Sequence, residues 1–313
     1  MEVPRRALVT GANGFVGQVM VPALAASGYD VIATGRRPSA DAQQLDVTDA
    51  QACRDAVAAA APDVVVHLAG VTYLPQVFER QRESFAANVL GARNVLEAVL
   101  DAAPEARTLL VSTCSVYGSP ETHELPLKED APLRALHPYG VQKIGVEVLG
   151  DAYGRRGLDI VVVRPFNHVG PGMDMRLSVA FFAGQIVAAE RGEREPIMRV
   201  GNLAARRDFM DVRDVVRAYL MLLQHSAPPR LTNIASGRSI AIADVLDALR
   251  ARARVDMQVE NDPGRMRPLD TPDLAGDASL IRSVCGWAPE IPLEDTWDRI
   301  LAWARDEPYG DVW

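Results

Sequence analysis

The feature that most constrains the fold is a regular alternation of short β-branched runs with alanine- and leucine-rich stretches of helical length. The runs are apolar on both faces: ALVT at 7–10, DVIAT at 30–34, DVVVHLAG at 63–70, RTLLVST at 107–113 and DIVVVRPF at 159–166. Strands of this kind, joined by helical crossovers, form a parallel sheet that helices cover on both sides. We therefore predict an α/β fold built on a doubly wound parallel sheet.

The composition of the sequence changes after about residue 167, where proline, glycine and arginine become more frequent and the apolar runs become shorter. We expect a nucleotide-binding domain over residues 1–166, with contributions from about 208–236. Residues 167–313 are expected to form mainly a smaller C-terminal substrate-binding region. Open α/β sheets bind ligands at the carboxyl ends of their strands, so the second region should lie at that edge.

Charge and cysteine content exclude several classes of partner. The net charge is −8 and the sequence has no basic run, which argues against binding to nucleic acid or to an anionic membrane surface. The three cysteines, Cys53, Cys114 and Cys285, are far apart and lack CxxC spacing, so we expect neither a disulfide scaffold nor a metal site. The sequence enters a strand without a signal peptide and has no run long enough to span a bilayer, so we expect a cytoplasmic protein.

The first βα turn reads VTGANGFVGQ, with glycines at 11, 14 and 17. This G-x-x-G-x-x-G spacing departs from the dinucleotide fingerprint G-x-G-x-x-G and also suits a plain turn that caps a helix. Its place as the first turn of an alternating chain favours nucleotide binding by a Rossmann-like domain. The cofactor contacts predicted from this turn are Gly11, Asn13, Gly14, Phe15, Val16 and Gly17.

The end of the second strand indicates which cofactor is bound. An NAD site usually carries an acid there, but here Gly35 stands in its place and Arg36 and Arg37 follow. A guanidinium can pair with a 2′-phosphate, although loop arginines can also be plain surface charge, so NADP(H) is favoured and NAD(H) stays open. The remaining predicted cofactor contacts are Asp46 and Val47 beside the adenine, and Leu68, Ala69 and Gly70 at the next strand end.

Two residues of HPYGVQKIG suggest proton chemistry. Tyr139 and Lys143 are four apart on a predicted helix and so share one face. A lysine beside a tyrosine should lower the tyrosine pKa toward the working pH, which would let the phenol exchange a proton with a carbinol oxygen. Thr113, at the end of the preceding strand, would supply a further hydrogen bond to that oxygen.

At this point the sequence resembles the extended short-chain dehydrogenases/reductases, the family of nucleotide-sugar epimerases, dehydratases and ketoreductases. TGANGFVG, HLAG, VSTCSVYG, YGVQK, RPFNHVGPG and RRDFMDVRDVV carry the resemblance and extend over most of the chain. It implies Thr113, Tyr139 and Lys143 as the catalytic set, and a homodimer formed by helices at 84–103 and 139–153 as a four-helix bundle. The GRR, RPFNHVGPG and VGNLAARRDFMDVRDVV segments are most similar to the GDP-sugar branch. The resemblance implies substrate contacts at Asn167, Arg207 and Arg267, the two arginines clamping a diphosphate. Thr72 and Ser115 are further predicted substrate contacts.

One absent acid separates the activities of that branch. Dehydratases of the family carry an acid two residues before the tyrosine of VYG, where this sequence has Ser115, preceded by Cys114. Neither side chain can act as a carboxylic acid. We therefore expect NADPH-dependent reduction of the 4-keto group of a GDP-4-keto-6-deoxy sugar. A nucleotide-sugar 4-epimerase with tightly bound NAD and a non-catalytic NADP-sensing protein are the alternatives.

Overall fold

Parallel strands form the central sheet of the computed structural model, which describes residues 5–265 and 271–307. Seven strands follow one another in the order β11-β6-β5-β4-β1-β2-β3, each parallel to its neighbour. Their bounds are β1 (Arg6–Thr10), β2 (Asp30–Gly35), β3 (Gln43–Gln44), β4 (Val64–His67), β5 (Arg107–Val111), β6 (Ile160–Pro165) and β11 (Leu231–Ile234). The order reverses between β1 and β4, as in doubly wound nucleotide-binding folds, so the predicted fold class is confirmed.

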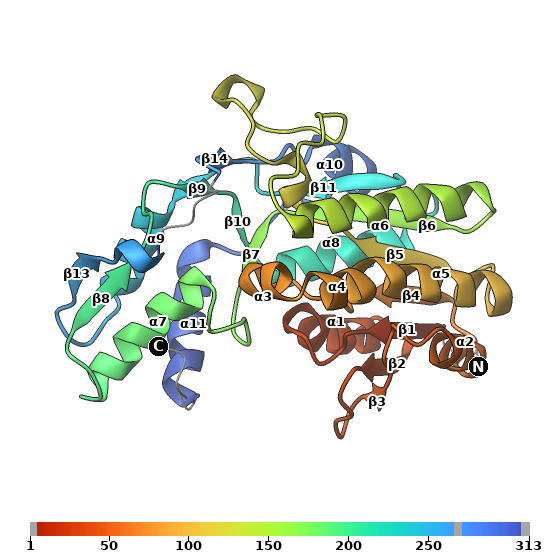
Figure 1. The fold of residues 1–313 in the computed structure, drawn as a ribbon, viewed down its shortest axis with the longest axis horizontal. Coiled ribbons are helices and arrows are strands. Elements are labelled where there is room, and N and C mark those ends of the chain that lie inside the picture. Colours follow the sequence, from red (N-terminus) through yellow and green to blue (C-terminus); the bar gives the residue numbers. More distant parts are fainter. Residues whose placement is uncertain (1–4, 266–270, 308–313) are drawn as a thin grey trace.

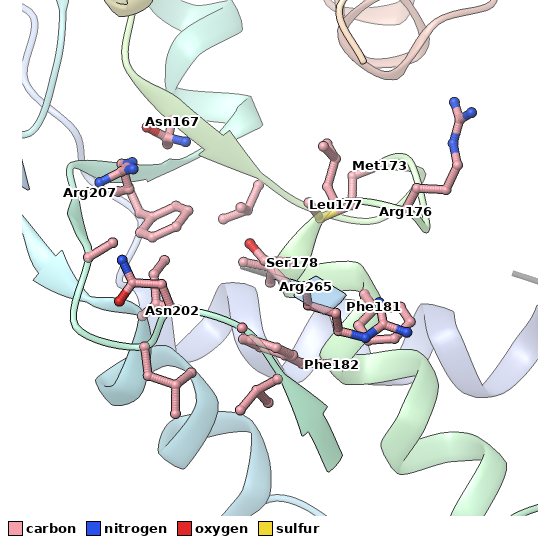
Figure 2. Close-up of a pocket in the computed structure, with 18 of the residues that line it drawn as sticks. Asn167, Met173, Arg176, Leu177, Ser178, Phe181, Phe182, Asn202, Arg207 and Arg265 are labelled. Carbon is pink, nitrogen blue, oxygen red and sulfur yellow. The ribbon is translucent and has the colours of Figure 1, made fainter. Parts of the chain in front are cut away.

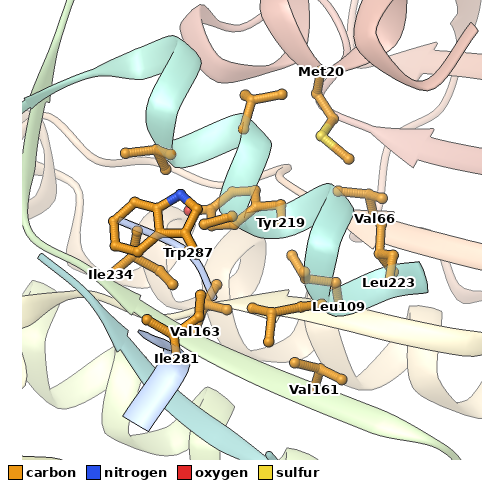
Figure 3. Packing of buried hydrophobic residues seen from close by; sticks show 14 of the residues in the cluster. Met20, Val66, Leu109, Val161, Val163, Tyr219, Leu223, Ile234, Ile281 and Trp287 are labelled. Carbon is orange, nitrogen blue, oxygen red and sulfur yellow. The ribbon is translucent and has the colours of Figure 1, made fainter. Parts of the chain in front are cut away.

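Helices cover both faces of this sheet because successive strand residues point to opposite sides (Figure 1). Val66 packs into a core with α1 (Phe15–Ala26), α8 (Val212–Gln224) and α10 (Ser279–Cys285). Figure 3 shows Tyr219 and Leu223 of α8 and Trp287 together with strand residues of this core such as Leu109 and Val163. Val65 packs on the other face, with α2 (Ala50–Ala60), α5 (Gly91–Ala102) and α6 (Pro138–Arg155).

The helix expected over 84–103 is interrupted. After α3 (Leu74–Glu79) and α4 (Gln81–Phe85), the chain forms a π-helical turn, Ala86–Leu90, before α5 begins. Buried Asn88 lies in this turn and bonds both backbone groups of Val71, at 2.7 and 2.9 Å. Its amide also donates to Gln142 of α6 at 2.7 Å. These bonds hold Asn88 in place within the π-turn, which contains one more residue than a turn of α-helix.

A second core forms from segments that follow β6, on the left of Figure 1. Its helices are α7 (Ser178–Glu190), α9 (Ile242–Arg250) and α11 (Leu293–Asp306). The short strands outside the central sheet are β7 (Asn167–Val169), β8 (Ile197–Val200), β9 (Arg206–Arg207), β10 (Phe209–Asp211), β12 (Ile240–Ala241), β13 (Gln258–Asn261) and β14 (Asp273–Leu274). Between them the chain returns to the first core through α8 and β11. Across the described ranges, the helices include none that is both long and apolar enough to cross a membrane.

Candidate active site

A cavity of about 430 Å³ opens at the carboxyl ends of the central strands. It is lined by the glycine turn after β1, the strand ends of β4, β5 and β6, the start of α6, and residues of the second core. The predicted site residues that it brings together are Gly11, Gly14, Phe15, Val16, Gly17, Leu68, Gly70, Thr72, Thr113, Ser115, Tyr139, Lys143, Asn167 and Arg207. Residues more than a hundred positions apart in sequence therefore face one space.

The glycine turn is too tight for side chains at two of its three glycines. Gly11 has φ +72°, and a Cβ there would lie 2.7 Å from the backbone nitrogen of Ala69. A Cβ on Gly17 would lie 2.4 Å from the carbonyl oxygen of Ala12. Gly14 precedes α1, where its backbone takes the N-cap position without a side-chain cap. The turn thus presents the amino end of a helix to the cavity, which favours an anionic ligand.

Asn13 joins the glycine turn to the arginine loop after β2. Its Nδ2 donates to the carbonyl oxygen of Arg37 at 2.9 Å, and Gly35 packs so closely that a Cβ there would lie 2.8 Å from that nitrogen. Arg36 and Arg37 are exposed beside this junction. Hydrogen bonds from Thr48 and the charge of Arg36 lower the pKa of Asp46. An exposed cationic loop therefore lies next to the turn.

Some predicted cofactor contacts lie outside this cavity. Asn13, Arg36, Arg37, Asp46 and Ala69 are not among its lining residues. Val47 is 6% exposed and packs in the core beside α5, where its carbonyl accepts from Asn94. Val47 therefore offers little side-chain surface to a ligand.

Tyr139, Lys143 and Thr113 converge at the end of β5. His137 caps α6 by accepting from the backbone of Gly140 at 3.2 Å, so Tyr139 and Lys143 occupy the first turns of the helix. The Nζ of Lys143 donates to the carbonyl oxygen of Val111 at 2.7 Å and lies 5.9 Å from the centroid of the Tyr139 ring. The Thr113 side chain lies close enough to Tyr139 to favour its ionised form.

The expected lowering of the tyrosine pKa is wrong for this structure. Burial, assisted by Cys114, raises the pKa of Tyr139, and the Thr113 side chain only partly opposes this. The ammonium of Lys143 is directed at Val111 rather than at the phenolic oxygen, which explains why it does not reverse the shift. Burial also lowers the pKa of Lys143 to about 8. At neutral pH the pair is therefore a phenol and an ammonium.

The segment after Thr113 contributes hydroxyl groups but no acid. Thr113 Oγ1 accepts from the backbone of Ser115 at 3.2 Å and caps a short 3₁₀ helix, Cys114–Tyr117. Burial raises the thiol pKa of Cys114 to about 12, so it stays protonated. In the described part of the chain, Asp174 is the acidic side chain that lines the cavity. Burial alone would raise its pKa, but hydrogen bonds from Arg176 outweigh this and lower it.

A second cavity of about 260 Å³ adjoins the first, and both are lined by Asn167, His168, Leu177 and Arg207. Figure 2 shows Asn167 and Arg207 on one side and Arg265 beside Phe181 on the other. The Arg265 guanidinium lies 4.0 Å from the centroid of the Phe181 ring. Arg207 donates to the carbonyl oxygen of Thr271 at 2.6 Å, which fixes it at the junction of the two cavities.

Three features of the site were not predicted or could not be checked. Arg267 lies outside the described residues, but Arg265, two positions earlier in the same RMR segment, lines the second cavity. Asn88 supports the loop after β4, and its single buried amide gave no recognisable pattern in the sequence. His168 makes a 2.9 Å bond between its Nδ1 and the carbonyl oxygen of Phe166 and stacks on the Phe15 ring, which gives it a structural role at the cavity.

The family model of the NAD dependent epimerase/dehydratase family matches residues 7–235 of the chain. The chain belongs to this family. This confirms the predicted extended short-chain dehydrogenase/reductase relationship, and family members are NAD(P)-dependent enzymes acting on nucleotide sugars.

Relatives within the family include both reductases and epimerases. The GDP-6-deoxy-D-mannose reductase of Pseudomonas aeruginosa is 32% identical over 95% of this chain and 96% of that protein. The UDP-glucose 4-epimerase of Azospirillum brasilense is 29% identical over 96% of this chain and 92% of that protein. Among solved structures, RMD from Pseudomonas aeruginosa complexed with NADPH superposes with a TM-score of 0.87 at 30% identity, covering 96% of this chain and 99% of that one.

Proposed function

We propose that the protein reduces the 4-keto group of a GDP-4-keto-6-deoxy sugar with NADPH. The observation that carries this is the composition of the larger cavity. It holds the glycine turn together with Thr113, Tyr139 and Lys143, while its acidic side chain in the described ranges, Asp174, is paired with Arg176. Such a site can pass a proton to an oxygen, and its described residues offer no protonated carboxylic acid for elimination. The similarity to the Pseudomonas reductase supports the same reading.

The proposed mechanism follows from the protonation states. NADPH, when bound at the glycine turn, supplies the hydride. Tyr139, whose pKa burial raises, keeps its proton until negative charge develops on the substrate oxygen and then donates it. Thr113 donates a hydrogen bond to the same oxygen. Lys143, an ammonium below a pH of about 8, is bonded to Val111 before the reaction and lies 5.9 Å from the centre of the Tyr139 ring. Its charge would help to hold the phenolate once the proton has left.

The preference for NADPH rests on the loop after β2. Arg36 and Arg37 are exposed beside Asn13 of the glycine turn, where a 2′-phosphate would meet two cations. RMD of Pseudomonas aeruginosa was solved with NADPH, whereas MoeE5, 27% identical, was solved with UDP-glucuronic acid and NAD. Arg36 and Arg37 favour NADPH for this chain, with NAD(H) as the weaker ligand.

The joined cavities suit a nucleotide sugar that extends from one core to the other. The sugar would occupy the larger cavity near Thr72 and Ser115, with the diphosphate at Asn167 and Arg207. The nucleoside would then lie between Phe181, Phe182 and Arg265. In this arrangement residues 1–166, with about 208–236, hold the cofactor, and residues 167–313 mainly hold the substrate.

A 4-epimerase is the second candidate, because the same three residues serve both reactions and the Azospirillum relative is an epimerase. The two differ in how they use the cofactor. A reductase consumes one NADPH for each GDP-4-keto-6-deoxymannose converted, and it releases NADP. An epimerase retains NAD through purification and shows no net oxidation of added NADPH, an outcome that would replace our proposal.

We also propose a homodimer in the cytoplasm. Five large apolar side chains are exposed on α3, α4, the π-turn and α6: Phe78, Phe85, Leu90, Val141 and Val148. Pairing this surface with a second copy as a four-helix bundle would bury it. Sedimentation should give a dimer that Val148→Asp weakens and that Val259→Asp, on exposed β13, leaves intact. A monomeric wild type at micromolar concentration would overturn the proposal.

The proposed location in the cytoplasm is supported by the three free thiols, which suit a reducing compartment.

A further inference from the structure

A buried carboxylate lies two helical turns after Tyr139 on α6. Tyr139, Lys143 and Glu147 are spaced four residues apart and therefore share one face of the helix. The side chain of Glu147 is only 10% exposed. The sequence analysis gave this residue no role, and the proposed mechanism does not use it.

The Glu147 carboxylate joins three elements behind the catalytic residues. It accepts from Arg164 of β6 twice, from Nε at 2.8 Å and from Nη2 at 2.7 Å. It also accepts from the hydroxyl of Ser112, which immediately precedes Thr113. Since Lys143 donates to Val111, α6 is tied to two consecutive residues at the end of β5.

Arg164, the partner of Glu147, also binds residues outside α6 and β5. Its Nη1 donates to the hydroxyl of Tyr117 at 2.9 Å and to the carbonyl of Glu129 at 2.8 Å. The Tyr117 hydroxyl in turn donates to Asn233 of β11 at 2.7 Å. The 3₁₀ helix that Thr113 caps is therefore fixed at its far end by the same ion pair.

Glu147 also affects the protonation of Lys143, which several titratable groups surround. Lys143 faces Tyr139 and Glu147 of its own helix and His67 of β4, while Cys114 of the 3₁₀ helix faces Tyr139. Burial and Lys143 lower the pKa of His67 to about 3, so this imidazole is neutral. Glu147 is the neighbour whose charge favours the ammonium of Lys143, against the burial that lowers its pKa.

We infer that Glu147 is a positioning residue for the reaction: through Ser112 it sets the place of Thr113, and through its charge it keeps Lys143 an ammonium. This inference rests on the proposed reductase function. Its two parts predict different kinetic effects. Losing the charge should narrow the pH range of activity, whereas losing only the link to Ser112 should lower turnover without moving that range.

Glu147→Gln tests the charge, and Glu190→Gln is its matched control. Glu190 forms an equally bidentate ion pair with Arg305, at 2.8 Å for both bonds, with its own side chain 5% exposed, but in the second core. We expect Glu147→Gln to lower kcat about tenfold or more, with little change in the KM for the sugar. The fall in activity that accompanies neutralisation of Lys143, near pH 8 in the wild type, should move to lower pH. Glu190→Gln should keep the wild-type pH profile even if it lowers thermal stability equally.

Ser112→Ala keeps the inference testable if Glu147→Gln does not fold. It removes one hydroxyl and leaves the ion pair with Arg164 intact, so the variant should fold. We expect a severalfold lower kcat with an unchanged pH profile. Wild-type kcat in this variant would overturn the positioning role through Thr113. Identical pH profiles for Glu147→Gln and the wild type would overturn the electrostatic role.

A measurement of NADPH binding distinguishes a failure of this inference from a failure of the proposed function. If the wild type does not reduce the keto sugar, the proposed function fails. The pH dependence of NADPH binding, followed by cofactor fluorescence, still tests Glu147. A shift to lower pH in Glu147→Gln but not in Glu190→Gln would then support its effect on Lys143, and no shift would contradict it.

Discussion

The two joined cavities are built in different ways. The larger one lies at the ends of strands in a regular parallel sheet. Its glycine turn, Thr113 and the first turns of α6 are therefore held by buried strands and helices of the first core. The smaller one is formed by loops and strands of two to four residues around α7. In the proposed function, the first cavity is specialised for a fixed reaction geometry and the second for binding. Changes in the first should therefore lower kcat, and changes in the second should raise KM.

The largest expected effect comes from Tyr139→Phe in the larger cavity. Loss of the proton donor should reduce kcat about 10²–10⁴-fold while the Kd for NADPH stays nearly unchanged. Tyr153→Phe is the control, because Tyr153 lies on the same helix but bonds Glu97 away from the cavity. Steady-state kinetics and cofactor titration measure both. Wild-type turnover in Tyr139→Phe would show that the proton comes from elsewhere.

An intermediate effect is expected at the junction, from Arg207→Met. Removing a charge-assisted contact of about 1.5–3 kcal/mol should raise the KM for the nucleotide sugar by about 10–100-fold and leave kcat nearly constant. Arg206→Met is the neighbouring control, since Arg206 is exposed and bonds Ser239 outside both cavities. A loss confined to kcat would contradict the division between the cavities.

The smallest of these effects concerns the cofactor loop. Arg36→Ala should reduce the preference for NADPH over NADH about tenfold, because one contact to the 2′-phosphate is lost. Arg54→Ala removes a similarly exposed arginine that bonds Gln51 on α2, and it should leave the preference unchanged. Titration of the wild type with both cofactors is the reference. Equal affinity of the wild type for the two would remove the basis of the assignment.

The sequence predicted the larger cavity well because its signals are local. The apolar runs indicate five of the parallel strands, and the spacing of Gly11 to Gly17 and of Tyr139 to Lys143 requires no knowledge of distant contacts. The pKa of Tyr139 was predicted wrongly for the opposite reason. It depends on burial and on where the Lys143 ammonium is directed, and both are set by the packing of α6 against the end of β5.

The smaller cavity was predictable only in part. Asn167 and Arg207 lie in recognisable segments, but Phe181, Phe182 and Arg265 come together from a helix and a distant loop. In the sequence of α7, nothing distinguishes Phe181 and Phe182, which line the cavity, from neighbouring apolar residues that only pack in the core. The interruption of the expected helix at the π-turn likewise depends on the bonds of Asn88 to Val71 and Gln142, which are distant in sequence.

The most direct test of the central claim compares two reactions of the wild-type protein by NMR. With NADPH and GDP-4-keto-6-deoxymannose, we predict reduction at C4 to a GDP-6-deoxyhexose. With GDP-mannose and NADP, we predict no 4-keto-6-deoxy product, because the site offers Ser115 where elimination needs a carboxylic acid and its acid Asp174 is paired with Arg176. Efficient formation of the keto sugar from GDP-mannose would contradict the account and make the protein a dehydratase.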